Sequence, residues 1–380
     1  KPADLSRLKL KWAYAFPSAI RARSLPVVAM GAVFVGSNNG TVHAFDLDSG
    51  CARWTSNVGA EVRTAVVVES WPAGQKPASA PRLFFGDLMG RVYAMNALTG
   101  DVLWKARPSD HANATITGTP VLHDGLLYVP VSSLEVVTAA DEKYECCTFR
   151  GFVAALDPAT GEEKWRHYTV DREAVPQGKT RVGTTIMGPS GAPVWNSPTI
   201  DAKRGLLYHG SGENYSSPAD GNSDAVFAVN LKTGARQWRF QTTAGDAWNG
   251  TCTIYDAQGR QHPNCPAENG PDYDLSASVL LIDIGKGRQR IIATPKSGVV
   301  HALDPDKGGA LVWKTPVGRG SIQGGTHFGM AADGARIYVP IVDMKMKGDG
   351  KFHDTRGNPG LHAVDARNGR ILWSAIIDEK

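Results

Sequence analysis

The sequence lacks the features that mark several common classes of protein. No apolar stretch approaches the roughly 20 residues that a membrane-spanning helix needs. No Gly-x-Gly-x-x-Gly loop is present, which argues against a nicotinamide cofactor, and no Ser, His and Asp order typical of a nucleophilic hydrolase stands out. There is no Cys-x-x-Cys-His motif, so no c-type haem is attached to this chain.

An excess of charge is also lacking. The 380 residues include 41 Lys and Arg against 37 Asp and Glu, which gives a formal net charge of +4 at pH 7 without a basic run. Proteins that bind nucleic acid usually concentrate positive charge on one face or in one run. We therefore expect neither a nucleic acid partner nor a membrane span.

Cysteine is scarce, with five residues in the chain. Cys252 and Cys265 lie in one polar loop at a spacing that suits a loop-closing disulfide, and Cys51 is left over. Cys146 and Cys147 are adjacent, so they form either a disulfide with each other or two small buried thiols. Two disulfides in a chain of this size favour an oxidising compartment such as a periplasm.

Turn residues, by contrast, are plentiful, because the chain contains 42 Gly and 23 Pro. They predict short strands rather than long helices. One pattern recurs six times: a short apolar strand ends in Ala-x-Asp or Ala-x-Asn, a turn with Gly follows, and a second strand ends in Trp. The copies are Gly40–Trp54, Gly90–Trp104, Gly151–Trp165, Asp224–Trp238, Gly298–Trp313 and Gly360–Trp373.

Each copy predicts a β-hairpin, in which Asp or Asn caps the turn and Gly takes a positive φ. The closing Trp is large enough to pack between neighbouring sheets. Another strand pair precedes most copies, for example within Thr119–Ser133 and Ser197–Ser211. Units of four short strands repeated in this way are typical of β-propeller blades. We therefore predict an all-β fold, with residues 1–380 forming a single propeller domain.

The N-terminal segment Leu8–Phe16 resembles the second half of the hairpin motif without its first half. The last copy, which ends at Trp373, already has its own outer strand. Trp12 therefore lacks partners in this sequence, and we expect at least one further blade, supplied by another segment or chain.

The repeat Ala-x-Asp-x-x-Thr-Gly-x-x-x-Trp resembles the tryptophan-docking motif of quinoproteins, which are dehydrogenases on eight-bladed propellers that bind pyrroloquinoline quinone (PQQ). The loops YECCTFRGFVAALDPATG, VWNSPTID, GSGENYSSPADGNSDAVFAVNLKTG and GDAWNGTC resemble those of polyvinyl alcohol dehydrogenases, periplasmic members that oxidise secondary hydroxyls of a polymer. The resemblance covers nearly the whole chain. Six motifs against eight blades agrees with the expected further blades.

This resemblance implies a site for PQQ and Ca²⁺, in which a Trp stacks on the flat cofactor and hard oxygen ligands hold the cation. Trp195 stands where the family has its stacking Trp. Glu213 stands where the family has an amide metal ligand, with Asn214 beside it, and which of the two coordinates stays open. Glu135 matches the family's carboxylate ligand, with Glu145 as a rival.

Further residues are expected around the cofactor. Thr117 and Ser132 match family hydroxyls that bind a cofactor carboxylate, and Lys296 matches a cation beside the quinone oxygens, where it would stabilise developing negative charge. Arg63 begins an inner strand and is expected to face the axis and pair with a carboxylate. Asp343 is another candidate on the axis side.

The general base is the point at which the sequence departs from the family. An aspartate directly after a Trp takes the alcohol proton in the family, but Asn249 occupies that position here, and an amide is no base at neutral pH. Asp246 is our candidate, with Glu213 or a different mechanism as alternatives. Cys146 and Cys147 resemble the adjacent-cysteine disulfide that covers the other face of the quinone.

The sequence thus predicts a periplasmic, PQQ- and Ca²⁺-dependent oxidoreductase. Its substrate would be a secondary alcohol, including a polymeric one, and its electrons would pass to cytochrome c or to a separate haem domain. The alternative is a propeller without enzymatic activity that serves as a binding scaffold. A scaffold has no reason to place Trp195, Glu135, Glu213 and Lys296 at one end of a central channel.

Overall fold

The computed structural model describes residues 6–71, 79–344 and 357–377. In these residues the fold is built from antiparallel sheets of four strands, each following the order of the chain. The sheets contain β1 (Val27–Ala29), β2 (Ala32–Gly36), β3 (Thr41–Asp46) and β4 (Ala52–Asn57); β5 (Val67–Val68), β6 (Arg82–Gly86), β7 (Val92–Asn96) and β8 (Val102–Ala106); β10 (Val121–His123), β11 (Leu126–Ser133), β12 (Phe152–Leu156) and β13 (Glu163–Tyr168); β17 (Thr199–Asp201), β18 (Leu206–Gly210), β20 (Ala225–Asn230) and β21 (Arg236–Gln241); β22 (Leu280–Gly285), β23 (Arg288–Ala293), β24 (Val299–Asp304) and β25 (Ala310–Pro316); and β26 (Ala331–Asp333), β27 (Arg336–Ile341), β28 (Gly360–Asp365) and β29 (Ile371–Ile376).

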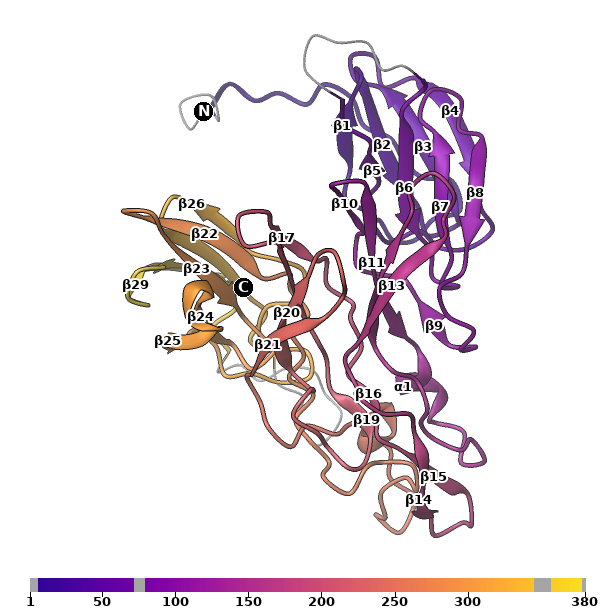
Figure 1. The fold of residues 1–380 in the computed structure, drawn as a ribbon, viewed down its shortest axis with the longest axis vertical. Coiled ribbons are helices and arrows are strands. Elements are labelled where there is room, and N and C mark those ends of the chain that lie inside the picture. Colours follow the sequence, from indigo (N-terminus) through magenta and orange to yellow (C-terminus); the bar gives the residue numbers. More distant parts are fainter. Residues whose placement is uncertain (1–5, 72–78, 345–356, 378–380) are drawn as a thin grey trace.

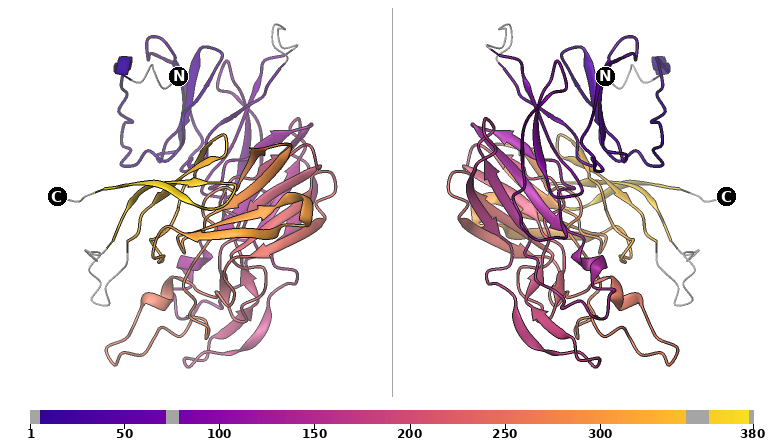
Figure 2. Two further views of the ribbon diagram at one scale, coloured as in Figure 1. Left: turned by 90° about the vertical axis from the view of Figure 1, so that its left-hand side faces the viewer. Right: turned by 90° about the vertical axis from the view of Figure 1, so that its right-hand side faces the viewer.

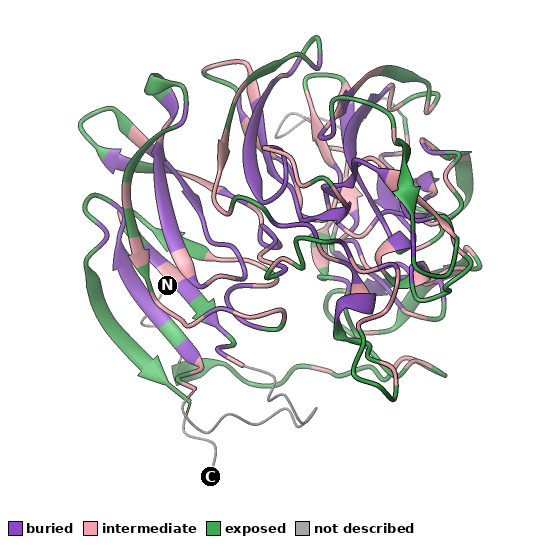
Figure 3. Cartoon of the chain, turned by 90° about the horizontal axis from the view of Figure 1, so that it is seen from below, coloured by how far each residue is buried: buried purple, intermediate pink, exposed green. Residues whose placement is uncertain are grey.

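The six sheets fan out around a common centre, as blades do (Figure 3). The middle strands of the inner sheets are buried along nearly their whole length, as in β12 and β20, because a neighbouring sheet covers each face. In the first sheet, Trp12 and Phe16 cover the second face of β2. The outermost strands, such as β4 and β8, are mostly exposed. The core is therefore a set of apolar layers between the blades, which explains why short Val-, Ala- and Phe-rich strands recur in the sequence.

Smaller elements extend from one end of the sheets (Figures 1 and 2). They are β9 (Ala114–Thr115), which pairs with β11; the helix α1 (Glu135–Thr138); the pairs β14 (Val175–Lys179) with β15 (Thr185–Gly188) and β16 (Ser190–Gly191) with β19 (Asn214–Ser216); and the 3-10 helix η2 (Gly250–Thr253). Another 3-10 helix, η3 (Pro305–Lys307), lies in a hairpin turn. The long loops therefore gather at the end where we expect the functional site.

The motif tryptophans dock each sheet onto the next one. Trp54 on β4 donates its Nε1–H to the carbonyl of Ala97 at 3.1 Å, and its ring lies against the turn at Gly100. A Cβ on Gly100 would approach that ring to 2.6 Å, and its φ is +78°. The turn glycine is thus needed both for its backbone conformation and for the room that the ring takes.

The segment Leu8–Phe16 forms no strand of the last sheet, whose outer strand β29 pairs with β28. The expectation that Trp12 lacks partners is wrong, because Trp12 packs on the first sheet, where its Nε1–H donates to the carbonyl of Leu47 at 3.1 Å and its ring faces Gly50. Trp12 thus lies on the turn glycine of the first sheet in the same way as Trp54 of the first sheet lies on Gly100 of the second sheet. The further blades stay a prediction.

In the described part of the chain, no helix has the length and apolar character required to span a membrane.

Candidate active site

A cavity of about 620 Å³ lies among the loops at the ends of several sheets. Its lining includes Trp195, which precedes β17, Glu213, which lies between β18 and β19, and Lys296, which lies between β23 and β24. Asp272 and Asp274, which precede β22, line it as well. The ends of two neighbouring sheets therefore deliver an aromatic ring, three carboxyl groups and an ammonium to one space.

The three carboxyl groups form a tight cluster. Glu213, Asp272 and Asp274 are buried, and each offers an oxygen within 4.8 Å of the others. Lys296 binds two of them, because its Nζ lies 2.8 Å from Oδ1 of Asp272 and 2.8 Å from Oδ2 of Asp274. Oδ1 of Asp274 accepts the backbone N–H of Glu213 at 2.8 Å. One ammonium thus faces three carboxyl groups in a buried space.

Burial and mutual repulsion shape the charges in this cluster. Burial raises the pKa of Glu213, and Asp274 raises it further. Burial also raises the pKa of Asp272, although Lys296 opposes the effect. For Asp274 burial acts in the same direction, but the ammonium of Lys296 wins and the pKa falls. The Lys296–Asp274 pair is therefore ionised, while a second cation would be needed to stabilise all three carboxylates.

Two observations show where such a cation would bind. Oε2 of Glu213 is buried and has no hydrogen-bond partner among the described residues. Within the same part of the chain, Oδ1 of Asp272 contacts Lys296 and no hydrogen bond engages Oδ2. Buried carboxylate oxygens that lack donors are costly unless they are protonated or coordinated. Clustered carboxylate oxygens are what a hard cation prefers.

The aromatic and basic parts of the lining complement this cluster. Nζ of Lys296 lies 5.5 Å from the centre of the Trp195 ring, within the range of a cation–π interaction. Arg63 and Arg23 also line the cavity, and both contact Glu61, at 2.9 and 3.6 Å respectively. The cavity therefore has an acidic part, a basic part and an aromatic ring, which a flat, anionic molecule bound together with a cation would match.

Comparisons with known proteins identify the family. A family model described as the beta-propeller domain of glucose, ethanol and alcohol dehydrogenases that use PQQ matches residues 1–256. The chain belongs to this quinoprotein family. A second family model, described as the outer membrane protein assembly factor BamB, matches residues 296–380.

Among curated quinoprotein relatives, a polyvinylalcohol dehydrogenase of Pseudomonas sp. is 37% identical over 98% of this chain and 55% of the relative. One from Sphingopyxis sp. (strain 113P3) is 35% identical with the same coverage. The chain therefore spans about half the length of the curated relatives that it matches.

Solved structures confirm the propeller fold of this quinoprotein. A europium-containing methanol dehydrogenase superposes with a TM-score of 0.69 at 18% identity, covering 98% of this chain and 74% of the other. The quinohemoprotein alcohol dehydrogenase of Comamonas testosteroni gives a TM-score of 0.64 at 19% identity, covering 98% and 70%. The all-β propeller with docking tryptophans, predicted from the repeat, is thus confirmed.

The structure brings together many of the residues that the sequence singled out. Trp195, Glu213, Lys296, Arg63, Thr117 and Ser132 all line the cavity. The remaining candidates lie outside its lining: Glu135, Asn214, Asp246, Cys146, Cys147 and Asp343. The rival Glu145 is exposed and also lies outside it.

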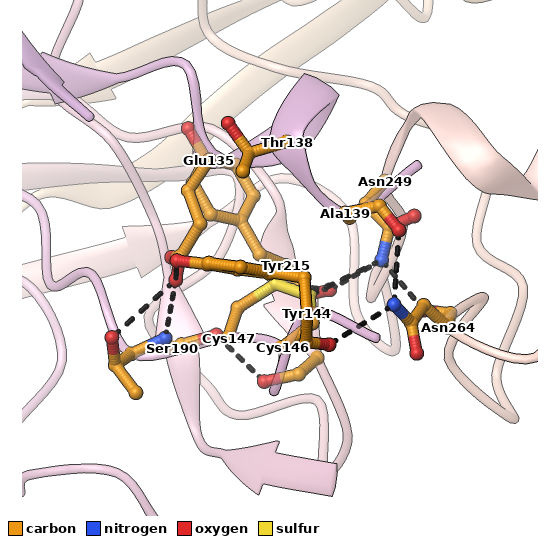
Figure 4. Close-up of a disulfide and its surroundings, with 12 residues drawn as sticks. Glu135, Thr138, Ala139, Tyr144, Cys146, Cys147, Ser190, Tyr215, Asn249 and Asn264 are labelled. Atoms are coloured by element: carbon orange, nitrogen blue, oxygen red, sulfur yellow. Dashed lines mark hydrogen bonds between the residues drawn. A yellow bond between two sulfur atoms is a disulfide. The ribbon is translucent and has the colours of Figure 1, made fainter. Parts of the chain in front are cut away.

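Glu135 is fully buried but serves the neighbouring loop instead of the cavity (Figure 4). Its Oε1 accepts the hydroxyl of Tyr144 and the backbone N–H of Thr148, both at 2.8 Å. Its Oε2 accepts the backbone N–H of Phe149 at 2.8 Å. With its oxygens engaged by these donors, Glu135 holds the loop around the adjacent cysteines, and it lies outside the cluster of Glu213, Asp272 and Asp274.

Asn214 and Asp246 are also engaged by the backbone. Nδ2 of Asn214 donates to the carbonyl of Ser190 at 2.9 Å, and its Oδ1 accepts the N–H of Asp220 at 2.8 Å. The carboxylate of Asp246 accepts the N–H of Asp272 at 3.1 Å and that of Tyr273 at 2.7 Å. Asp246 therefore positions the loop that carries the acidic cluster, and it lies behind the cavity.

Cys146 and Cys147 are joined in a disulfide, which settles the alternative that the sequence left open (Figure 4). Both are buried next to Tyr215, which lines the cavity, but neither cysteine is part of the lining itself. The predicted disulfide between Cys252 and Cys265 is confirmed, and Cys51 is a free, exposed cysteine. Asp343, lastly, pairs with Arg319 at 3.2 Å, away from the cavity lining.

Asp272 and Asp274 were not predicted from the sequence as site residues. Both stand in Pro-Asp-Tyr-Asp, directly before the sheet that also supplies Lys296. Asp274 directly follows Tyr273, so the chain contains an aromatic–aspartate pair in which Tyr replaces the Trp expected from the family.

Proposed function

We propose that this chain forms the cofactor-binding propeller of a PQQ- and Ca²⁺-dependent alcohol dehydrogenase that oxidises secondary alcohols to ketones. The observation that carries the proposal is the convergence of Trp195, Lys296 and the three clustered carboxyl groups in one cavity. Membership of the quinoprotein family supports it.

The residues fit a bound Ca²⁺. Glu213 presents a buried oxygen, Oε2, without a hydrogen-bond partner in the described residues, and Asp272 and Asp274 place further carboxylate oxygens within 4.8 Å of it. Ca²⁺ takes six to eight oxygen ligands, so it would offset the negative charge that Lys296 alone leaves uncompensated. Glu213 and Asp274 are the proposed protein ligands, which leaves Oδ2 of Asp272 free to act as a base.

The residues also fit PQQ. The ring of Trp195 offers a flat stacking surface, and the hydroxyls of Thr117 and Ser132 offer hydrogen bonds to carboxylates in the same cavity. Arg63 adds a guanidinium that is already partly neutralised by Glu61 at 2.9 Å. When bound, PQQ supplies the hydride acceptor, and Ca²⁺ polarises its reactive carbonyl.

The side chains of this cluster then have distinct roles. Asp272 accepts the hydroxyl proton of the alcohol at Oδ2, the oxygen that no described group engages. Lys296 donates hydrogen bonds from Nζ toward the oxygen on which negative charge develops. Asp274 keeps the ammonium of Lys296 and the N–H of Glu213 in place through its two oxygens. The alcohol leaves as a ketone after losing one proton and one hydride.

The polymer polyvinyl alcohol is the substrate named by the 37% and 35% identical relatives, and we propose that polymeric secondary alcohols are substrates of this protein too. Two electrons per turnover would pass to cytochrome c or to a separate haem domain. A periplasmic location is proposed, because its oxidising environment suits the disulfides Cys146–Cys147 and Cys252–Cys265.

Reconstitution of the protein tests the proposal. Addition of PQQ and Ca²⁺ should give saturable changes in cofactor absorbance, and the loaded protein should reduce an artificial dye in the presence of 2-butanol. Glu213→Gln should weaken Ca²⁺ binding, whereas Glu145→Gln, which changes an exposed carboxyl group outside the cavity, should not. A complete protein that binds neither PQQ nor Ca²⁺ would favour the scaffold alternative.

A further inference from the structure

One copy of the repeated hairpin departs from the others at the residue before its first strand. Four positions before the Ala of the motif, the other copies carry Gly40, Gly90, Gly151 and Gly298, whereas the copy that contains β20 carries Asp224. The backbone of Asp224 keeps a glycine-like conformation, with a φ of +48° beside +84° at Gly40 and +71° at Gly90. Any side chain strains this conformation, so the chain holds a carboxyl group at a backbone position that glycine fills more easily.

The carboxyl group of Asp224 is buried and receives no hydrogen bond from a donor in the described part of the chain. The residue is 0% exposed, and both Oδ1 and Oδ2 lack a donor there. Only its main chain is engaged, because its N–H donates to the carbonyl of Gly212 at 3.0 Å and its carbonyl accepts the hydroxyl of Thr242 at 2.7 Å. A buried carboxyl group without donors is stable only if it is protonated or bound to a cation.

The side chain of Asp224 faces a second buried carboxyl group, that of Asp246. The two groups lie within hydrogen-bond reach of each other, and Asp246 is also 0% exposed. Asp246 accepts the backbone N–H of Asp272 at 3.1 Å and that of Tyr273 at 2.7 Å. These donors favour the charged form of Asp246, so a proton shared by the pair belongs on Asp224, where it turns an acceptor into a donor.

The charges around Asp224 act in the same direction. Burial raises the pKa of Asp224 well above its ordinary value, and the negative charges of Asp246, Asp274 and Asp272 raise it further. Burial also raises the pKa of Asp246, but the hydrogen bond from Asp224 opposes this effect. Within the described residues, the cluster able to hold a metal ion consists of Glu213, Asp272 and Asp274 and does not include Asp224. A proton therefore satisfies Asp224 where a cation would lack ligands.

We propose that Asp224 is a neutral carboxylic acid whose O–H donates to Asp246 and thereby positions the loop that carries Asp272. The inference rests on the proposed function, in which Asp272 is the base. Asp224 lies outside the cavity lining and acts through Asp246, so it is a positioning residue. Its proton replaces the repulsion between two buried carboxylates by a hydrogen bond, which keeps the oxygens of Asp246 aimed at the N–H groups of Asp272 and Tyr273.

Two substitutions separate the donor from the backbone conformation. Asp224→Gly removes the carboxyl group and introduces the residue that other copies of the repeat carry, whereas Asp224→Asn retains a donor toward Asp246. In the protein without cofactor, Asp224→Gly should accelerate hydrogen exchange of the backbone amides of Asp272 and Tyr273 about tenfold, and Asp224→Asn should recover most of the protection. The matched control is Asp124→Gly, in an exposed turn with a φ of +45°, which should leave both amides unchanged.

Infrared spectroscopy detects the proton itself. At pH 7, one C=O stretching band of a protonated carboxylic acid should be lost from the spectrum of Asp224→Asn and from that of Asp224→Gly, and it should persist in Asp124→Gly. In the PQQ- and Ca²⁺-loaded protein, Asp224→Gly should lower kcat for 2-butanol about tenfold, because the base is no longer held in place. Asp224→Asn should recover most of this loss, which a purely structural role of the carboxyl group would not explain.

The outcomes separate this inference from the proposed function. Loss of the infrared band and faster exchange in Asp224→Gly support the carboxyl pair even if the loaded protein oxidises no alcohol, a result that would remove the proposed function alone. A band that persists in Asp224→Asn would overturn the inference, because Asp224 would then be ionised. Equal exchange in Asp224→Gly and the unchanged protein would overturn it as well, as would an Asp224→Asn protein that behaves like Asp224→Gly. If Asp224→Gly does not fold, the infrared band of Asp224→Asn decides.

Discussion

Replacing Lys296 by Met is the sharpest test of the acidic cluster. The ammonium forms two ion pairs at 2.8 Å, and the side chains of Lys296, Asp272 and Asp274 are 9%, 3% and 5% exposed. Removal of one partner from a buried ion pair costs about 3–5 kcal/mol, because the remaining charge is left without compensation. For a chain of this size, Lys296→Met should lower the melting temperature by on the order of 10 °C in a chelating buffer.

Calcium should reverse part of this loss. Without the ammonium, Glu213 and the two aspartates hold a cation more tightly, and a ligand at about 100 times its Kd adds about 2.7 kcal/mol. Differential scanning calorimetry with EGTA and then with excess Ca²⁺ measures both effects. Lys164→Met is the control, since Lys164 is 40% exposed and its pair with Glu162 contributes at most about 1 kcal/mol.

Two results would refute this reasoning. The first is a Lys296→Met protein that melts at the temperature of Lys164→Met in EGTA, which would mean that the buried pairs carry no net stability. The second is an equal rise of the melting temperature with Ca²⁺ in the unchanged protein and in Lys296→Met, which would mean that the cation binds elsewhere.

Other predictions concern the scaffold. In urea titrations, Gly100→Ala should lower the free energy of unfolding by about 2 kcal/mol more than Gly59→Ala does. Both glycines have a φ of +78°, but only a Cβ at Gly100 would meet the Trp54 ring. Equal losses would argue against docking of the ring as the cause. Burial lowers the pKa of His167 to about 4, below the unfolded value near 6.5, so between these pH values the unfolded chain binds one more proton. The free energy of unfolding should therefore fall by about 3 kcal/mol as pH drops from 6.5 to 4. His167→Phe should flatten this decline, measured from urea midpoints, and an unchanged slope would contradict the assignment. Glu135→Gln leaves one of the donors bound by the carboxylate without an acceptor, so the free energy of unfolding should fall by about 1–3 kcal/mol. Hydrogen exchange of the backbone amides in residues 146–149 should also accelerate. Unchanged exchange would show that the carboxylate does not hold this loop.

The fold was predictable because each blade repeats the same local chemistry. The apolar strand, the Asp or Asn that opens the turn and the Gly that follows are all visible within one hairpin. The second reason for Gly100 was not visible there, since the ring that packs on it comes from Trp54, 46 positions earlier. Repetition in the sequence therefore revealed the docking pattern, while the contact behind it needed the structure.

The site was only partly predictable, because sequence spacing does not show which carboxylate lacks donors. Glu135 and Glu213 are both buried and both follow serine-containing loops, yet backbone N–H groups engage the first and leave Oε2 of the second without a partner among the described residues. Asp272 and Asp274 lie outside the repeating hairpins. Their loop is fixed by Asp246, which accepts N–H groups from 26 and 27 positions further along the chain.

The hydrogen bonds of Asn249 explain why this position carries an amide instead of the aspartate expected from the family. Nδ2 of Asn249 donates to the carbonyls of Tyr215 and Asn264 at 2.9 and 2.8 Å (Figure 4). Its Oδ1 accepts the N–H of Thr251 at 3.0 Å. This position needs a donor as well as an acceptor, and an ionised aspartate offers no donor. An acid there would leave two buried carbonyls unsatisfied. In the proposed mechanism, the carboxylate that takes a proton from substrate therefore comes from another loop, that of Asp272, which contacts Lys296.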